Sequence, residues 1–138
     1  SSLGAFVKTI EFMKKNNVIK HIWRYGNELI SIFNSLAKKY DIEKNFIIKG
    51  PSCSPSYTLL DDNGKVSMPL RTLFAQEMIK QNILIPWIAI CYHHGDKELK
   101  ITKNALNKVF PIIRKALDNG VDKYLDGDII KPVFRKFN

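Results

Sequence analysis

Apolar side chains recur at three- and four-residue steps in two stretches near the start of the chain, a spacing that predicts amphipathic helices. The first stretch covers residues 3–13 and is broken by Asn16-Asn17. The second runs from Val18 to Tyr40 as one continuous stripe that contains Gly26. Because a glycine inside a helix costs about 1 kcal/mol relative to alanine, we expect Gly26 to permit close packing against another element.

From Asn45 onward the apolar pattern changes to short runs that are typical of strands. Residues 46–48 and 56–60 predict two strands. Asp61-Asp62-Asn63-Gly64 predicts a tight turn after them, because Asn and Gly accept positive φ angles. Residues 83–90 are apolar and β-branched, so they predict a third strand with Pro86 at an edge or a bend.

Two further helices are predicted in the second half of the chain. Ser67 is a plausible N-cap for a helix over residues 70–78, with Pro69 in its first turn. The last helix begins at Asp96, contains Pro111, which we expect to kink it, and ends before Gly120 as a cap. This order predicts an α+β (α/β two-layer) fold, in which helices pack on one face of a small, mostly antiparallel sheet. We expect one domain over residues 1–120 and a loosely attached tail over residues 121–138, with a weak apolar cluster at Ile129-Ile130.

Composition narrows the class of protein. A chain of 138 residues with 45% hydrophobic residues is long and apolar enough for one domain with a real core. The longest apolar run, residues 83–92, is far too short to cross a bilayer, and two cysteines are typical of free thiols inside the cell. We therefore expect a soluble, cytoplasmic protein without membrane contact. The absence of an initiator methionine indicates a trimmed or partial protein.

One cluster combines the residue types used in metal sites and nucleophilic catalysis: Cys91, His93 and His94, with Cys53 as a further zinc ligand. Adjacent histidines on an extended segment point to opposite faces, so both could bind one ion only after a local bend. The favoured interpretation is a buried Cys91 and a loop histidine pair, with no metal site. A small metal-dependent hydrolase remains an alternative.

The formal net charge of +9 permits an anionic partner but does not require one. Lys20, His21 and Arg24 present a basic helical face beside Trp23, so a free-standing basic module that binds nucleic acid or another anion is the main alternative function. Aromatic side chains that could stack on bases are interpreted instead as core residues: Trp23, Tyr25, Trp87 and Tyr92. Nucleic-acid binding is therefore not favoured.

Several segments, taken in order, resemble the C-terminal small domain of class-III (fold type I) aminotransferases, and above all glutamate-1-semialdehyde aminomutases. They are SLGAFVKTIEFMKK at 2–15, VIKHIWRYG at 18–26, GPSCSP through YT at 50–58, RTLFAQEM at 71–78, ILIP at 83–86 and YHHG at 92–95. The resemblance covers residues 2–118 and consists of ordered local similarities.

The resemblance implies a parent enzyme that carries pyridoxal phosphate on a lysine of a large N-terminal domain and works as a homodimer on a small amino compound. No lysine of this chain matches that position, so we expect this piece to hold no cofactor and no catalytic residue. It is expected to wall the substrate cleft with Ser52, Cys53, Ser54, Trp87 and His94. His94 matches a histidine often found at the end of this family's loop. Its main role there would be to fix the loop, and contact with the substrate would be its secondary role.

The resemblance leaves the reaction open between amino transfer and aminomutation. The loop over residues 86–91 is shorter than in typical semialdehyde aminomutases and lacks their acidic residue, so another amino compound, such as a sugar precursor, fits as well. A small domain of this kind should expose apolar surface where the large domain packs. We expect the first helix, which bridges the domains in the family, to be the element most able to shift or swap.

Overall fold

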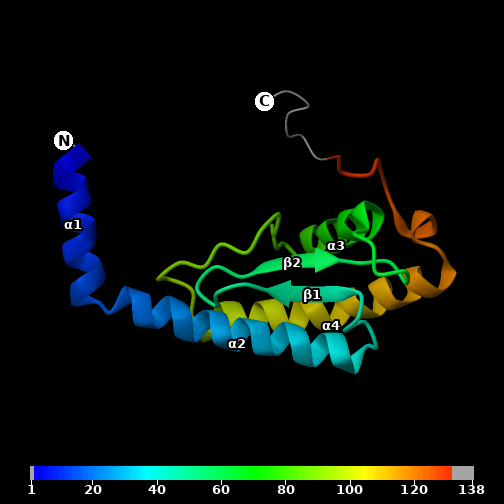
Figure 1. The fold of residues 1–138 in the computed structure, drawn as a ribbon, viewed down its shortest axis with the longest axis horizontal. Helices are drawn as coiled ribbons and strands as arrows, with labels where there is room; N and C mark the ends of the chain where they lie inside the picture. The colour runs from blue at the N-terminus through cyan, green and yellow to red at the C-terminus, as the bar shows by residue number, and fades with distance from the viewer. Residues whose placement is uncertain (1, 132–138) are drawn as a thin grey trace.

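The computed structural model describes residues 2–131, which form four α-helices, one two-stranded sheet and a short 3₁₀ helix. In chain order these are α1 (Ser2–Lys15), α2 (Val18–Lys39), β1 (Phe46–Lys49), β2 (Ser56–Leu59), α3 (Met68–Lys80), α4 (Asp96–Asn119) and η1 (Val121–Tyr124). Figure 1 shows α2 and α4 running side by side along the sheet, while α1 projects from one end of the molecule. The predicted α+β class is confirmed.

The sheet presents one face to the helices. β1 and β2 pair antiparallel, so that Phe46 lies opposite Leu59 and Ile48 opposite Tyr57. Because side chains alternate along a strand, these four share one face, and three of them are buried. The last pair, Lys49 and Ser56, is exposed. This burial pattern confirms the expected two-layer packing.

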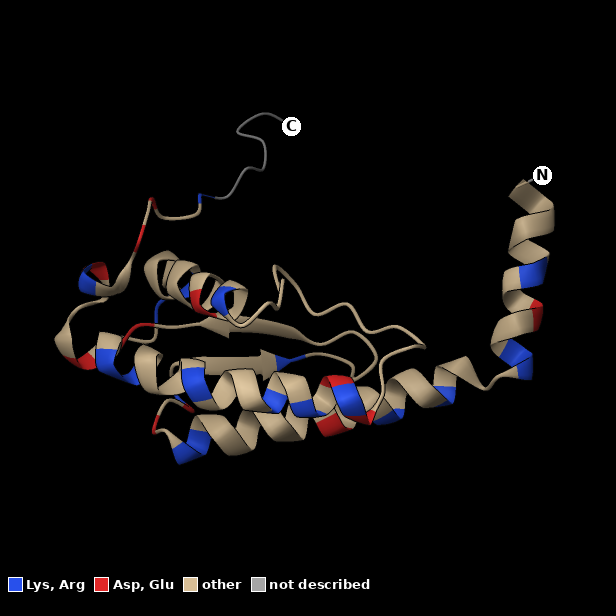
Figure 2. Ribbon diagram, turned by 180° about the vertical axis from the view of Figure 1, so that it is seen from behind, with Lys and Arg blue, Asp and Glu red and all other residues tan. Residues whose placement is uncertain are grey.

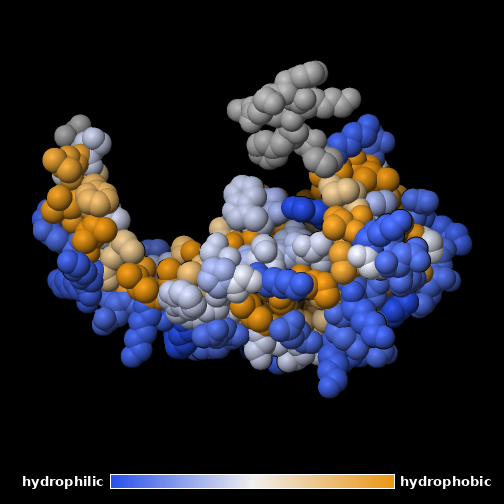
Figure 3. All heavy atoms as spheres, in the orientation of Figure 1, coloured by the Kyte–Doolittle hydropathy of each residue, from blue (hydrophilic) through white to orange (hydrophobic). Residues whose placement is uncertain are grey.

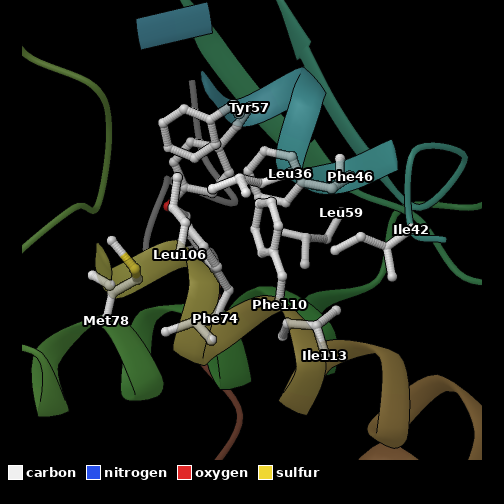
Figure 4. Packing of buried hydrophobic residues seen from close by; sticks show 14 of the residues in the cluster. Leu36, Ile42, Phe46, Tyr57, Leu59, Phe74, Met78, Leu106, Phe110 and Ile113 are labelled. Carbon is white, nitrogen blue, oxygen red and sulfur yellow. The ribbon is translucent and has the colours of Figure 1, made fainter. Parts of the chain in front are cut away.

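Aromatic side chains from both layers meet in the core (Figure 4). The ring of Phe46 lies 5.7 Å from that of Tyr57, 5.2 Å from Phe74 and 5.1 Å from Phe110, measured between centroids. Phe33 of α2 stacks on the same ring at 5.4 Å. Phe46 therefore joins the sheet to α2, α3 and α4 at once.

The predicted turns and caps are present. Asp61 accepts backbone hydrogen bonds from Asn63 and Lys65, and Gly64 adopts a φ of 75°. The hydroxyl of Ser67 accepts from the Leu70 N–H at 3.3 Å and caps α3. The chain breaks between α1 and α2 at Asn17, whose φ is 51°. Each of these turns and caps depends on a few neighbouring residues, and for this reason the sequence alone predicts them.

The end of the last long helix also follows the predicted pattern. Gly120 has a φ of 89° and terminates α4, which continues as one helix through Pro111. A 3₁₀ helix, η1, follows directly.

The predicted third strand is wrong. Residues 81–95 contain neither helix nor strand, and two of their carbonyl groups accept hydrogen bonds from side chains instead of from a neighbouring strand. Tyr57 donates to the Ile85 carbonyl at 2.6 Å, and Arg71 donates to that of Pro86 at 3.3 Å. Pro86 has no N–H to offer a sheet partner, and Asn82 turns the chain with a φ of 60°.

The segment expected to form a loose tail is held on α3 as far as residue 130. Gln76 donates to the Tyr124 carbonyl at 2.9 Å and accepts from the Asp126 N–H at 2.8 Å. Thr72 accepts from the Ile130 N–H at 3.0 Å. Residues 132–138 of the expected tail lie outside the described residues.

Charge is spread over the surface. Figure 2 shows Lys and Arg on each of the four long helices, with Asp and Glu interspersed. Across residues 2–131, no helix combines the length and hydropathy that a bilayer span needs.

Candidate functional site: an apolar cleft beside Tyr25 and Glu98

The irregular segment 81–95, which we call the α3–α4 loop, is fixed to α2 near its end. The ring Nε2 of His21 donates to the His94 carbonyl over 2.8 Å. Within the loop, the Cys91 N–H donates to Nδ1 of His94 at 3.4 Å. The ring of Tyr25 lies 5.5 Å from the His94 ring, between centroids. The first two turns of α2 thus position the end of the loop.

Gly26 brings a second segment to the same place on α2. A Cβ atom at Gly26 would lie 1.7 Å from the carbonyl oxygen of Ser52 and 3.0 Å from a methyl carbon of Ile90. The expected close approach at Gly26 is therefore confirmed. The turn that carries residues 52–54 and the α3–α4 loop meet over this glycine.

A cleft of about 390 Å³ opens between α2, α4 and the α3–α4 loop. Tyr25 and Leu29 line it from α2, and Glu98 and Thr102 line it from α4. Each pair is spaced by four residues, which places both members on one face of their helix. The loop supplies isoleucines, Trp87 and His94. Such a volume suits a small molecule or a few side chains.

Two titratable groups in the cleft have defined states near neutral pH. Burial raises the pKa of Tyr25 to about 12, and the negative charge of Glu98 adds to the shift. Its phenol therefore stays neutral. A hydrogen bond from the Gly95 N–H, at 2.9 Å, lowers the pKa of the Glu98 carboxyl. The cleft thus contains a neutral hydroxyl and an ionised carboxylate.

The predicted cleft-wall residues fall into two groups. Trp87 and His94 line this cleft, with Trp87 70% exposed and His94 half-buried. Ser52 is buried within the turn, Cys53 is half-buried and Ser54 is exposed, and these three lie outside the cleft lining. The turn that carries these three residues lies next to the α3–α4 loop, because both segments contact Gly26.

Three of the four aromatic residues predicted to be core lie outside it, among them Tyr92, which is half-buried on the α3–α4 loop. Tyr25 is buried as expected, but Trp23 is 44% exposed and Trp87 is 70% exposed. Trp23 lies off the apolar stripe of α2, and Trp87 lies in the loop that fails to form a strand. Cys91, expected to be buried, is also exposed.

The structure does not favour the two alternative sites, the metal site at Cys91 and the basic face around Lys20. Among residues 2–131, no group of three His, Cys, Asp or Glu side chains is placed to hold a metal ion, and Cys91 and His94 instead close the loop. On the basic face, His21 is committed to the His94 carbonyl and Arg24 forms an ion pair with Glu28 at 3.6 Å. Lys20 and Arg24 both stay exposed, and the side chain of Arg24 is 60% exposed despite its ion pair.

Sequence reasoning missed Glu98 and the hydroxyl of Tyr25. Tyr25 fits the apolar stripe of α2, and that pattern predicts a core ring without predicting a role for its hydroxyl. Glu98 stands three residues after Gly95, a spacing that signals a helix start. That signal predicts the cap but not the cleft, because the cleft exists only once α2, α4 and the loop pack together.

Comparison with known proteins relates the chain to an aminotransferase sequence. No family model matches the chain, and no solved structure matches it. A 3-aminobutyryl-CoA aminotransferase of Cloacimonas acidaminovorans (strain Evry) is 24% identical over 116 residues, which are 82% of this chain but 28% of that protein. The chain thus spans little more than a quarter of the relative. Its sequence is similar to one part of an aminotransferase.

Proposed function

We propose that this chain is the small domain of a pyridoxal-phosphate aminotransferase and walls a substrate cleft next to a separate catalytic domain. The observation that carries this proposal is the alignment of 82% of the chain with 28% of a 3-aminobutyryl-CoA aminotransferase. The relative's name favours amino transfer over aminomutation. As the class-III resemblance implies, we propose a small amino compound as substrate and a homodimeric, cytoplasmic whole enzyme.

The exposed apolar surface supports the proposal that this chain packs against another protein unit. α1 has no buried residue, and its Leu3, Phe6 and Phe12 are 74%, 62% and 48% exposed. Leu84 and Trp87 of the α3–α4 loop are 80% and 70% exposed. Figure 3 shows apolar side chains gathered along α1. Exposed apolar side chains in such numbers mark a surface that packs against another protein unit.

The described residues do not by themselves fit pyridoxal phosphate. The cofactor needs a lysine amine in a protected site, whereas every lysine among residues 2–131 is exposed and none lines the cleft. We therefore derive no reaction step on this chain. Under the proposal its work is to bind and orient substrate and to exclude water from chemistry carried out by the catalytic domain.

The test is to express the complete reading frame that encodes residues 1–138 and to measure bound pyridoxal phosphate and amino transfer between an amine donor and a 2-oxo acid. We expect one cofactor per chain and transfer activity, and neither from residues 1–138 alone. A complete protein without cofactor and without transfer overturns the proposal. So does cofactor-dependent transfer by residues 1–138 alone.

Variants of the complete protein test the role of the loop. Leu84→Ser or Trp87→Ala is expected to raise KM several-fold or weaken the attachment of the two domains, because both side chains are exposed on the proposed contact surface. Ile79→Ser is the matched control, since Ile79 is 54% exposed on α3 and does not line the cleft. Equal kinetics for all three variants would contradict the proposed role of the loop.

A further inference from the structure

α1 is joined to the rest of the molecule by a short connection and by a contact between two aromatic rings. Asn16 and Asn17 separate it from α2, and Asn17 turns the chain with a φ of 51°. α1 has no buried residue, and it projects from the end of the molecule at which α2 begins (Figure 1). The ring of Phe12 lies 5.6 Å from the ring of Tyr92, measured between centroids, in an edge-to-face arrangement. Phe12 therefore ties this exposed helix to the α3–α4 loop.

Tyr92 belongs to a turn whose two ends are bonded to each other. The His94 N–H donates to the Cys91 carbonyl at 3.2 Å, and the Cys91 N–H donates to Nδ1 of His94 at 3.4 Å. Because of these two bonds, we expect residues 91–94 to move as one unit. A shift of the Tyr92 ring therefore carries His94 with it.

His21 of α2 contacts the same turn at two points. Its ring lies 5.3 Å from the ring of Tyr92, between centroids, and its Nε2 donates to the His94 carbonyl at 2.8 Å. Tyr92 thus packs against both Phe12 of α1 and His21 of α2. His94 in turn lines the cleft. Packed rings and hydrogen bonds form a continuous path from α1 to the cleft wall.

We propose that Phe12 and Tyr92 are positioning residues for the cleft, which link the direction of α1 to the place of His94 in the cleft wall. Neither side chain lines the cleft, so both act through the turn over residues 91–94. The inference rests on the proposed function in one respect, because α1 is taken to pack against the catalytic domain. Contact with that domain would fix α1 and thereby fix His94, whereas an unattached α1 leaves the turn more mobile.

Hydrogen exchange of residues 1–138, followed by NMR, tests the path from α1 to the turn. Phe12→Ala removes the ring that contacts Tyr92. It should speed exchange of the Cys91 and His94 amide hydrogens about two- to tenfold, which is the range that one aromatic pair contributes. Phe12→Leu keeps an apolar side chain and should restore part of the protection. Phe6→Ala is the matched control, because Phe6 is 62% exposed on the same helix.

A double-mutant cycle shows whether Phe12 acts through Tyr92. Tyr92→Ala should speed exchange of the same two amide hydrogens. Phe12→Ala added to Tyr92→Ala should have little further effect, because the contact between the rings is already lost. Amide hydrogens in the middle of α3 and α4 should keep their wild-type rates in every variant, which distinguishes a local release of the turn from a general loss of stability.

The complete protein gives the functional readout. Phe12→Ala should raise KM several-fold and leave kcat within about twofold of wild type. The reason is that a misplaced cleft wall weakens substrate binding, while the reacting groups lie on the catalytic domain.

Faster exchange that is confined to the turn, with no added effect of Phe12→Ala in the Tyr92→Ala background, supports the proposal. Unchanged exchange in Phe12→Ala, equal effects of Phe12→Ala and Phe6→Ala, or fully additive effects of the two substitutions in the cycle overturns it. An active complete protein whose KM does not respond to Phe12→Ala overturns it as well. A complete protein without amino transfer overturns the proposed function, and the exchange rates of residues 1–138 then still decide whether α1 is linked to the turn.

Discussion

Gly26 of α2 touches the backbone of Ser52 so closely that a methyl group on the glycine would lie 1.7 Å from the Ser52 carbonyl oxygen. No Cβ atom tolerates that distance, and the obstructing atom belongs to backbone and cannot rotate away. The glycine is therefore the point at which α2 admits the turn between β1 and β2. The α3–α4 loop arrives at the same point through Ile90.

Gly26→Ala is expected to lower the free energy of unfolding by about 2–4 kcal/mol, because α2 and the turn must separate. The gain in helix propensity, about 1 kcal/mol, offsets part of this loss. Urea unfolding followed by circular dichroism measures the change. Gly4→Ala in α1 is the matched control, since nothing lies within 4 Å of its added methyl group. A Gly26→Ala protein as stable as Gly4→Ala would refute the close contact.

Tyr57→Phe removes the hydroxyl that donates to the Ile85 carbonyl at 2.6 Å. The carbonyl then loses a partner in a part-buried place, so we expect a loss of about 1–2 kcal/mol in unfolding free energy. In limited proteolysis, the α3–α4 loop of the variant should also be cleaved faster than that of the wild-type protein. Tyr124→Phe is the comparison, because its hydroxyl contacts exposed Asn119 at 3.4 Å and should change stability by less than about 0.5 kcal/mol. Equal effects from the two variants would count against the proposed anchor.

Phe46→Ala should be the most damaging of these substitutions. The ring packs against four other aromatic rings within 5.7 Å between centroids, and the residue is 2% exposed. Its removal opens a cavity that the sheet and helices cannot close, with an expected loss of about 3–5 kcal/mol. Phe6→Ala, at a residue that is 62% exposed on α1, is expected to leave the melting temperature nearly unchanged. Thermal unfolding of both variants measures this difference, and equal melting temperatures would contradict the central role of Phe46.

Stability should fall at alkaline pH because of Tyr25. Burial raises the pKa of this phenol to about 12 in the folded protein, above its ordinary value of 10.0. Below pH 10 both folded and unfolded states are protonated, and the full stability is present. As pH rises from 10 to 12 the unfolded phenol ionises first, so folding stability declines by about 1 kcal/mol per pH unit.

Urea unfolding at pH 9, 10 and 11 measures this decline, with Tyr25→Phe as the variant that should show a shallower one. Tyr40→Phe serves as the control because it keeps Tyr25 and should retain the steep decline. The same slope for wild type and Tyr25→Phe would show that another group dominates the alkaline loss. Burial also raises the pKa of Tyr57, so part of the decline is expected to remain in Tyr25→Phe.

Local signals determined most of the fold from sequence alone. The three- and four-residue spacing of α2, the N-cap at Ser67, the Asp61–Gly64 turn and the stop at Gly120 each depend on a few neighbouring residues. Their backbone hydrogen bonds close within the same short segment. A sequence pattern suffices for such elements because their energetics do not need the rest of the chain.

Tertiary structure decided the α3–α4 loop and the cleft. Residues 83–90 are apolar enough for a strand, but the carbonyl groups of Ile85 and Pro86 accept hydrogen bonds from Tyr57 and Arg71, which are distant in sequence, instead of from a neighbouring strand. Tyr25 and Glu98 likewise become neighbours only when α2 and α4 pack against each other. Composition and spacing describe what each segment can do, whereas the partner of a hydrogen bond or a charge is chosen by packing across the whole chain.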